Sequence, residues 1–178
     1  MSRNIDGHLL LTGMMGSGKS TVGPKLAQAL HYSFYDLDDE IVAAKGVSIA
    51  EIFERYGEAT FRQWELESLS QLLSQPVPVV LALGGGSLGN ERVFSLIQHH
   101  QVIWLEAPTE ALWHRVCDSP RPLVKRGLEA FRRMHQQRRK AYAKAAMFQV
   151  DCNQDPDIIV RTIVEKLGAH GNEQRNSD

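Results

Sequence analysis

The stretch Gly13-Met14-Met15-Gly16-Ser17-Gly18-Lys19-Ser20 decides the fold, because it fits the P-loop pattern of two spaced glycines followed by Lys and Ser. In such a loop the glycines let the backbone wrap a polyphosphate, and the helix that follows adds N–H groups and its positive dipole end. Lys19 is then expected to reach the outer phosphates and Ser20 to hold Mg²⁺. The stretch therefore predicts a nucleotide site, whose residues we expect to be Gly13, Gly16, Ser17, Gly18, Lys19, Ser20 and Thr21.

The flanking sequence has the order that this motif requires. Residues 8–12 form an apolar run of strand length, and Val22, Leu26 and Leu30 recur at helical spacing after the loop. The alternative is a chance glycine-rich turn, but the two glycines, Lys19, Ser20 and the correct flanks together disfavour it. We therefore expect a strand, a phosphate-binding loop and a helix in succession.

Length and composition suit a single domain. The chain has 178 residues, of which 43% are hydrophobic, so we expect one domain over residues 1–168 and a disordered tail over residues 169–178. The net charge of −1 gives no overall attraction to nucleic acid or to an anionic membrane, and we expect a monomer. No run has the length of a membrane span or signal peptide, and Cys117 and Cys152 lack metal-ligand spacing. These features predict a cytoplasmic protein.

Strand and helix patterns alternate along the whole chain. The predicted strands are residues 8–12, 32–36, 77–83, 102–105 and 148–151. The predicted helices are residues 20–30, 48–56, 58–74, 90–99, 109–117, 128–146 and 156–167, with Thr109 as an N-cap. The alternation predicts an α/β fold in which helices cover both faces of a five-stranded parallel sheet, with ligands at the carboxyl edge of the strands.

Acidic residues and glycines follow two of these predicted strands. Asp36 is a candidate Mg²⁺ ligand, directly or through water, and Asp38 is a candidate to accept a substrate hydroxyl proton. The alternative for the acidic residues is favourable charge at a helix N-terminus, which accounts for Asp39 and Glu40. After the third strand, the triple glycine of residues 84–86 costs chain entropy, which favours a backbone that approaches a ligand over a merely flexible turn.

Residues 118–127 are expected to form a mobile lid. The segment is polar and contains Pro120, Pro122 and three basic residues. One of these, Arg121, could swing over ATP and stabilise transition-state charge, or it could be a solvated loop charge.

Helical geometry distinguishes two adjacent arginines in the basic helix. At about 100° per residue, Phe131, Met134 and Tyr142 cluster on one side, with Arg138 near the middle of the stripe. Arg139 is turned away from it. An inward arginine needs an anionic partner, which is either a substrate carboxylate or an acidic core residue.

The chain resembles shikimate kinases over residues 9–167. The resemblance rests on the P-loop, Asp36-Leu37-Asp38, Phe61-Arg62 followed by Glu65, Leu83-Gly84-Gly85-Gly86, Arg121-Pro122-Leu123, and Arg138 four residues before Tyr142. The P-loop is common to many families, whereas the later motifs in this order are specific.

The resemblance implies a P-loop fold like that of nucleoside monophosphate kinases, with strand order 2-3-1-4-5 and a lid. It implies transfer of the ATP γ-phosphoryl group to the 3-hydroxyl of shikimate, with Mg²⁺, in aromatic amino-acid biosynthesis. It also implies that Asp38 holds the substrate hydroxyls, Arg62 and Arg138 grip the carboxylate, Gly85 with its neighbours Gly84 and Gly86 contacts the substrate, Arg121 touches the phosphates and Arg115 lies against adenine.

Two other functions compete with this one. Another small-molecule kinase of similar fold, such as a gluconate kinase, shares the P-loop but has no evident need for Arg62, Arg138 and the triple glycine together. A nucleotide-binding regulator without catalysis is disfavoured by the presence of Lys19, Ser20, Asp38 and Arg121.

Overall fold

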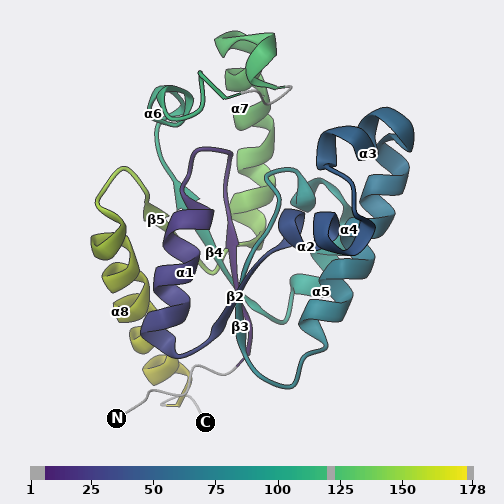
Figure 1. Cartoon of the computed structure of the whole chain (residues 1–178). Coiled ribbons are helices and arrows are strands. Elements are labelled where there is room, and N and C mark those ends of the chain that lie inside the picture. Colours follow the sequence, from purple (N-terminus) through teal and green to yellow (C-terminus); the bar gives the residue numbers. More distant parts are fainter. Residues whose placement is uncertain (1–6, 120–122, 176–178) are drawn as a thin grey trace.

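A five-stranded parallel sheet forms the centre of the computed structural model, which describes residues 7–119 and 123–175. Its strands are β1 (Leu9–Thr12), β2 (Ser33–Asp36), β3 (Val79–Ala82), β4 (Gln101–Glu106) and β5 (Phe148–Asp151). They pair in the order β2-β3-β1-β4-β5, and every pairing is parallel. The predicted fold class and strand order are therefore confirmed (Figure 1).

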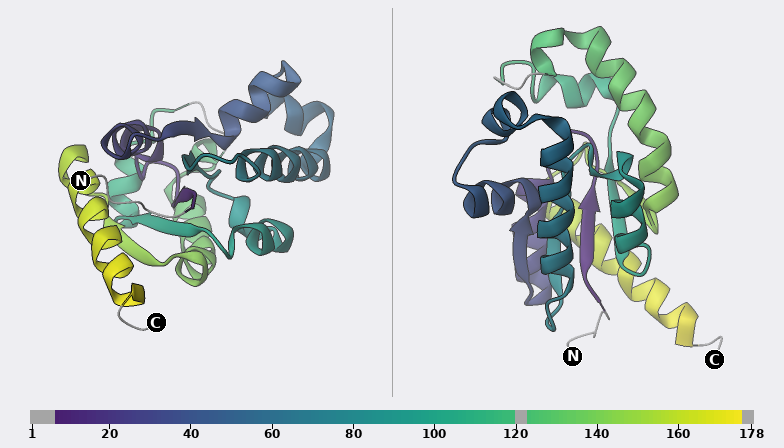
Figure 2. Two further views of the ribbon diagram at one scale, coloured as in Figure 1. Left: turned by 90° about the horizontal axis from the view of Figure 1, so that it is seen from below. Right: turned by 90° about the vertical axis from the view of Figure 1, so that its right-hand side faces the viewer.

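Helices cover both faces of this sheet. They are α1 (Lys19–Leu30), α2 (Leu37–Lys45), α3 (Ile49–Arg55), α4 (Gly57–Leu73), α5 (Glu91–Ile97), α6 (Thr109–His114), α7 (Leu128–Ala145) and α8 (Pro156–Arg175), with short 3₁₀ turns η1 (Ser87–Gly89) and η2 (Val124–Arg126). Figures 1 and 2 show α1 beside α8 on one face and α4, α5 and α7 on the other. Above the carboxyl edge, α6 and the first turns of α7 extend beyond the strands (Figure 1).

The central strands are apolar because both of their faces are covered. Side chains of β1 and β3 are at most 1% exposed, which fits the continuous hydrophobic runs of a buried parallel sheet. On the α1 side, a Cβ atom added to Gly23 would lie 2.1 Å from the Phe34 ring. The absence of a side chain at Gly23 therefore lets α1 pack directly on β2.

Side-chain caps explain where several of the helices start. The Ser48 hydroxyl accepts a hydrogen bond from the Glu51 N–H at 3.2 Å, which makes Ser48 the N-cap of α3. Asn90 caps α5 in the same way.

The start of α6 and the end of α8 are among the predicted helix boundaries that were wrong. Thr109 is the first residue of α6 rather than its N-cap, because its hydroxyl lies 2.9 Å from His135 Nδ1 and so bonds to α7. The last helix does not end near Leu167 but continues to Arg175, so the tail that we expected to be disordered is helical over residues 169–175.

The termini of the described chain lie at the end of the sheet opposite the P-loop (Figure 1). Within residues 7–119 and 123–175, no helix combines the length and the hydropathy needed to cross a membrane.

Candidate active site

The P-loop connects β1 to α1 and is shaped by three glycines in positive φ. Gly13 has φ 145°, Gly16 has φ 85° and Gly18 has φ 87°, a region that side-chain-bearing residues rarely adopt. The Lys19 ammonium donates hydrogen bonds to the carbonyls of Gly13 at 2.8 Å and Met14 at 3.3 Å. The loop thus curls around one cation, and the first N–H groups of α1 have no acceptor within the helix. This is the geometry of an anion cradle.

Ser20 and Asp36 lie together beside this cradle. The Ser20 hydroxyl donates to Asp36 Oδ2 at 2.9 Å, which joins the first turn of α1 to the end of β2. The other carboxylate oxygen of Asp36 accepts from the Asp38 N–H at 3.1 Å and caps α2. The two side chains offer a hydroxyl and a carboxylate, which are the hard oxygen donors that suit Mg²⁺.

No group of three or more His, Cys, Asp or Glu side chains suited to a metal ion occurs in the described part of the chain. A Mg²⁺ ion at Ser20 and Asp36 does not require one, because this ion keeps several waters and takes other ligands from phosphates. The residues present therefore fit the expected ion.

The triple glycine brings the predicted substrate residues to one place. A Cβ atom added to Gly84 would lie 3.1 Å from Asp38 Oδ1, and one added to Gly86 would lie 3.0 Å from Arg62 Nη2 and 3.1 Å from Arg138 Nη2. Side chains from α2, α4 and α7 thus crowd the same short backbone segment. This crowding explains in physical terms why these positions are glycines.

The same segment also contacts the P-loop. A Cβ atom added to Gly85 would lie 3.6 Å from the Gly13 carbonyl and 3.7 Å from the Met15 N–H. On the α7 side, Gly85 and Gly86 line a cleft of about 290 Å³ together with Gln137, Arg138 and Tyr142. The place where Asp38 and the two arginines meet is therefore next to the predicted phosphate site.

Glu65 is a site residue whose role the sequence did not reveal. Its side chain is fully buried and accepts from Arg62 Nη1 at 2.8 Å with one oxygen and from the Ser87 hydroxyl at 2.6 Å with the other. Glu65 therefore holds the Arg62 guanidinium in place and ties the end of the triple glycine to α4. Its spacing of three residues from Arg62, on the same helix face, was the available signal.

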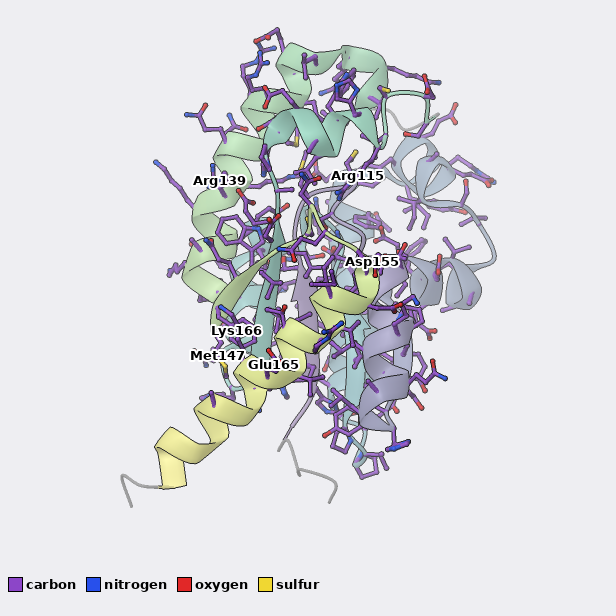
Figure 3. The ribbon with its side chains drawn as sticks, turned by 90° about the vertical axis from the view of Figure 1, so that its left-hand side faces the viewer. Arg115, Arg139, Met147, Asp155, Glu165 and Lys166 are labelled. Carbon is purple, nitrogen blue, oxygen red and sulfur yellow. The ribbon has the colours of Figure 1, made fainter. Side chains whose placement is uncertain are left out.

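Arg138 faces the triple glycine, as the helical stripe predicted. Among the described residues, no carboxylate lies within ion-pair distance of Arg138, whose Nη1 donates to the Met14 sulfur at 3.7 Å. Neighbouring Arg139 instead pairs with Glu106 at 3.0 Å, on the side of α7 seen in Figure 3. The described residues thus give Arg138 no ion pair with an acidic core residue, the alternative that we considered, and its binding of a substrate carboxylate stays a prediction.

Tyr142 fixes the triple glycine from the α7 side. Its hydroxyl donates to the Gly85 carbonyl at 2.5 Å. Burial raises the pKa of Tyr142 to about 12, although the nearby Arg138 opposes this shift. The phenol therefore stays protonated at neutral pH and remains a hydrogen-bond donor to the loop.

Two predicted nucleotide contacts, those of Arg115 and Arg121, stay predictions for different reasons. Arg115, expected against adenine, donates hydrogen bonds to the Gly16 and Cys152 carbonyls and to the Asn153 side chain. Its contact with adenine stays a prediction. Arg121 lies outside the described residues, so its contact with the phosphates stays a prediction as well. Thr21 is exposed on α1, one residue after Ser20.

Comparison with known proteins gives one consistent family. Residues 15–168 match the protein-family model described as shikimate kinase. Over 169 residues the chain is 40% identical to a shikimate kinase of Neisseria gonorrhoeae, a match that covers 93% of this chain and 98% of that protein. The structure of shikimate kinase from Acinetobacter baumannii in complex with shikimate is similar, with a TM-score of 0.86 at 31% identity over 92% of this chain and 94% of that one. A gluconokinase from Sinorhizobium meliloti has a TM-score of 0.68 at 18% identity over 99% of both chains, a likeness of fold alone.

Proposed function

Because the chain belongs to the shikimate kinase family, we propose that it transfers the γ-phosphoryl group of ATP to the 3-hydroxyl of shikimate. The observation that carries this proposal is the meeting of Arg62, Arg138 and Asp38 at a triple glycine that touches the P-loop. Two cations and one carboxylate, placed beside a phosphate cradle, match a small hydroxylated acid as the acceptor.

The two arginines would bind the acceptor carboxylate. Both guanidiniums approach the same point above Gly86, and Arg138 has no carboxylate partner among the described residues. Two like charges in this position repel each other, and an anion between them relieves the repulsion while accepting charge-assisted hydrogen bonds. Glu65 already neutralises part of the Arg62 charge, so a single carboxylate completes the local balance.

Asp38 would orient the acceptor hydroxyl and remove its proton. It lies at the start of α2 near Gly84, on the side of the glycine segment that faces α2. In the proposed step the hydroxyl oxygen forms a bond to the γ-phosphorus, the bond from this phosphorus to the bridging oxygen of ADP breaks, and the hydroxyl proton passes to the Asp38 carboxylate. Product release then requires that this proton leave Asp38 for solvent.

Lys19 and the P-loop would hold the nucleotide. The Lys19 ammonium already bonds to the loop at Gly13 and Met14, where it can move onto the outer phosphates. Ser20 and Asp36 would hold Mg²⁺, which when bound neutralises phosphate charge. In phosphoryl transfer the protein mostly positions reactants and stabilises charge, so these contacts supply most of the expected rate enhancement.

Three further parts of the proposal concern the molecule as a whole. Residues 118–127 would act as a lid that brings Arg121 to the phosphates and excludes water. The enzyme would act as a monomer. It would act in the cytoplasm, and the free thiols of Cys117 and Cys152 support this location, since unpaired thiols are typical of reducing compartments.

A coupled assay tests the proposed function. ADP release from Mg-ATP is followed with shikimate, with gluconate and with no acceptor, under otherwise identical conditions. We expect rapid ADP release in the mixture that contains shikimate, and slow release with gluconate or with no acceptor. Release with gluconate instead would identify a different small-molecule kinase, and ATP binding without release in any mixture would identify a nucleotide-binding regulator.

A further inference from the structure

Arg115 joins the two sides of the predicted nucleotide site. It caps the C-terminus of α6, and Figure 3 shows it between α6 and the loop that precedes α8. The guanidinium donates to the Gly16 carbonyl of the P-loop at 2.9 Å, to the Cys152 carbonyl at 3.0 Å and to Asn153 Oδ1 at 3.0 Å. One exposed side chain thus bridges α6, the P-loop and the segment after β5.

The P-loop packs directly against α6 at the residue that Arg115 holds. A Cβ atom added to Gly16 would lie 2.7 Å from the Leu112 carbonyl and 3.2 Å from the Val116 side chain. Gly16 also has φ 85°. The turn of the P-loop at Gly16 is therefore pressed on α6 and kept there by the Arg115 hydrogen bond.

The acceptors of Arg115 are unusual for an arginine that is exposed to solvent. All three well-formed hydrogen bonds go to neutral oxygens, and none goes to a carboxylate. Surface ion pairs contribute little stability and are easily exchanged, whereas a rigid guanidinium fork that bonds to two backbone carbonyls fixes two chain segments relative to each other. These contacts indicate that Arg115 fixes the P-loop relative to the segment after β5, rather than serving only as a surface charge that keeps the protein in solution.

We propose that Arg115 is a positioning residue for the triphosphate, which acts by holding the Gly16 turn of the P-loop in its phosphate-binding conformation. This inference rests on the proposed function. This role is separate from the expected contact with adenine and compatible with it, because the hydrogen bonds use the N–H edge of the guanidinium whereas a base would stack on its face. Arg115 would thus couple the phosphate cradle to the side of the site where a base would bind.

Inorganic tripolyphosphate separates the two roles, because it has the phosphates of ATP and no adenine. Binding of Mg-ATP and of Mg-tripolyphosphate is measured by titration calorimetry for the wild type, for Arg115→Ala and for Asn153→Ala. The neighbouring His114, which is also exposed, supplies the control variant His114→Ala. Shikimate affinity and circular dichroism are recorded for all variants, since a general loss of structure would change them too.

We expect Arg115→Ala to weaken Mg-tripolyphosphate about tenfold, because hydrogen bonds that position the loop are lost. Asn153→Ala removes one of the three hydrogen bonds of Arg115 and is expected to weaken Mg-tripolyphosphate less. We expect His114→Ala to bind Mg-tripolyphosphate as the wild type does, and all variants to keep the shikimate affinity of the wild type. Tripolyphosphate binding within about twofold of the wild type, together with weaker ATP binding, would overturn the inference, because Arg115 would then act on adenine alone. A wild type that binds neither ligand would instead contradict the proposed function.

Discussion

At the scale of single residues, the site depends on where each charge is held. The Asp38 carboxylate lies near Gly84, whereas the Asp36 carboxylate accepts from Ser20, so the proposed base and the acidic member of the proposed metal site are different carboxylates. The two adjacent arginines of α7 likewise have different partners, because Arg139 pairs with Glu106 while Arg138 turns to the triple glycine. A one-residue step along the helix thus separates an arginine held in an ion pair from one that faces the proposed substrate site.

Asp38→Asn should separate binding from turnover. An amide has nearly the size of the carboxylate but cannot accept the hydroxyl proton, so we expect kcat to fall by about 10² to 10⁴ while Mg-ATP affinity is kept. Steady-state kinetics and ATP titration measure the two quantities. If ATP affinity falls with kcat, Asp38 belongs to the metal site rather than to the acceptor.

Arg139→Ala should affect stability more than binding. The variant loses the Glu106 ion pair and the contact of the guanidinium with the Trp104 ring, 5.7 Å from its centroid. We expect a loss of about 1 kcal/mol in the free energy of unfolding, because Arg139 is half exposed, and nearly unchanged shikimate affinity. Denaturant unfolding measures the stability, and calorimetric titration measures the shikimate affinity. A large loss of shikimate affinity in Arg139→Ala would show that the assignment of the carboxylate site to Arg138 is wrong.

At the scale of elements, short segments between strands and helices build the site. The P-loop and the triple glycine lie side by side because they follow β1 and β3, which are neighbours in the sheet, although about 70 residues separate them in the chain. Their glycines could be read from the sequence as ligand-facing. The partners of those glycines could not, because α2, α4 and α7 meet there only through the tertiary fold.

Gly86→Ala tests the crowding at the triple glycine. The added methyl group would displace the flexible ends of Arg62 and Arg138, and Gly86 has φ −107°, so the backbone tolerates alanine. We expect the KM for shikimate to rise about ten- to hundredfold with little change in the KM for ATP. Gln98→Ala is the control, because Gln98 is exposed at the end of α5 and does not line the cleft beside the triple glycine. Equal effects of the two changes would mean that the crowding at Gly86 is irrelevant to binding.

At the scale of the whole molecule, periodicity predicted the parallel sheet, and the family resemblance supplied its strand order. The alternation of apolar strands and amphipathic helices predicted the five-stranded sheet, and the P-loop predicted the position of the cradle. The prediction of Thr109 as an N-cap failed because its hydroxyl is hydrogen-bonded to His135 on α7 instead of to the backbone of α6. The role of Glu65 depends on Ser87 and Arg62 at once, which no local pattern contains.

Acid should destabilise the end of the sheet opposite the site. Burial, followed by electrostatic interaction with His8 and His99, lowers the pKa of His100 from its ordinary value of 6.5, and the His100 ring lies 5.1 Å from that of His8. The folded state therefore binds the His100 proton less readily than the unfolded chain does. The contribution of neutral His100 to the free energy of unfolding is therefore fully present above pH 6.5 and is lost as the pH falls through the lowered pKa of His100 in the folded state.

Urea unfolding at about pH 7.5 and about pH 5.5 measures this dependence. We expect His100→Gln to reduce the stability difference between the two conditions, while His114→Gln, on the exposed surface of α6, leaves it as in the wild type. An unchanged difference in His100→Gln would assign the acid sensitivity to other groups.

The central claim is that the acceptor carboxylate is bound by Arg62 and Arg138 above Gly86, next to the P-loop. The most direct test compares the affinities of shikimate and its uncharged methyl ester in the wild type, in Arg138→Ala and in Arg133→Ala, a control for an exposed arginine on the same helix. We predict that Arg138→Ala weakens shikimate by about 2–5 kcal/mol, the cost of truncating one member of a desolvated charge pair, and that it barely affects the ester. Equal losses for acid and ester in Arg138→Ala, or an equal loss in Arg133→Ala, would contradict the claim.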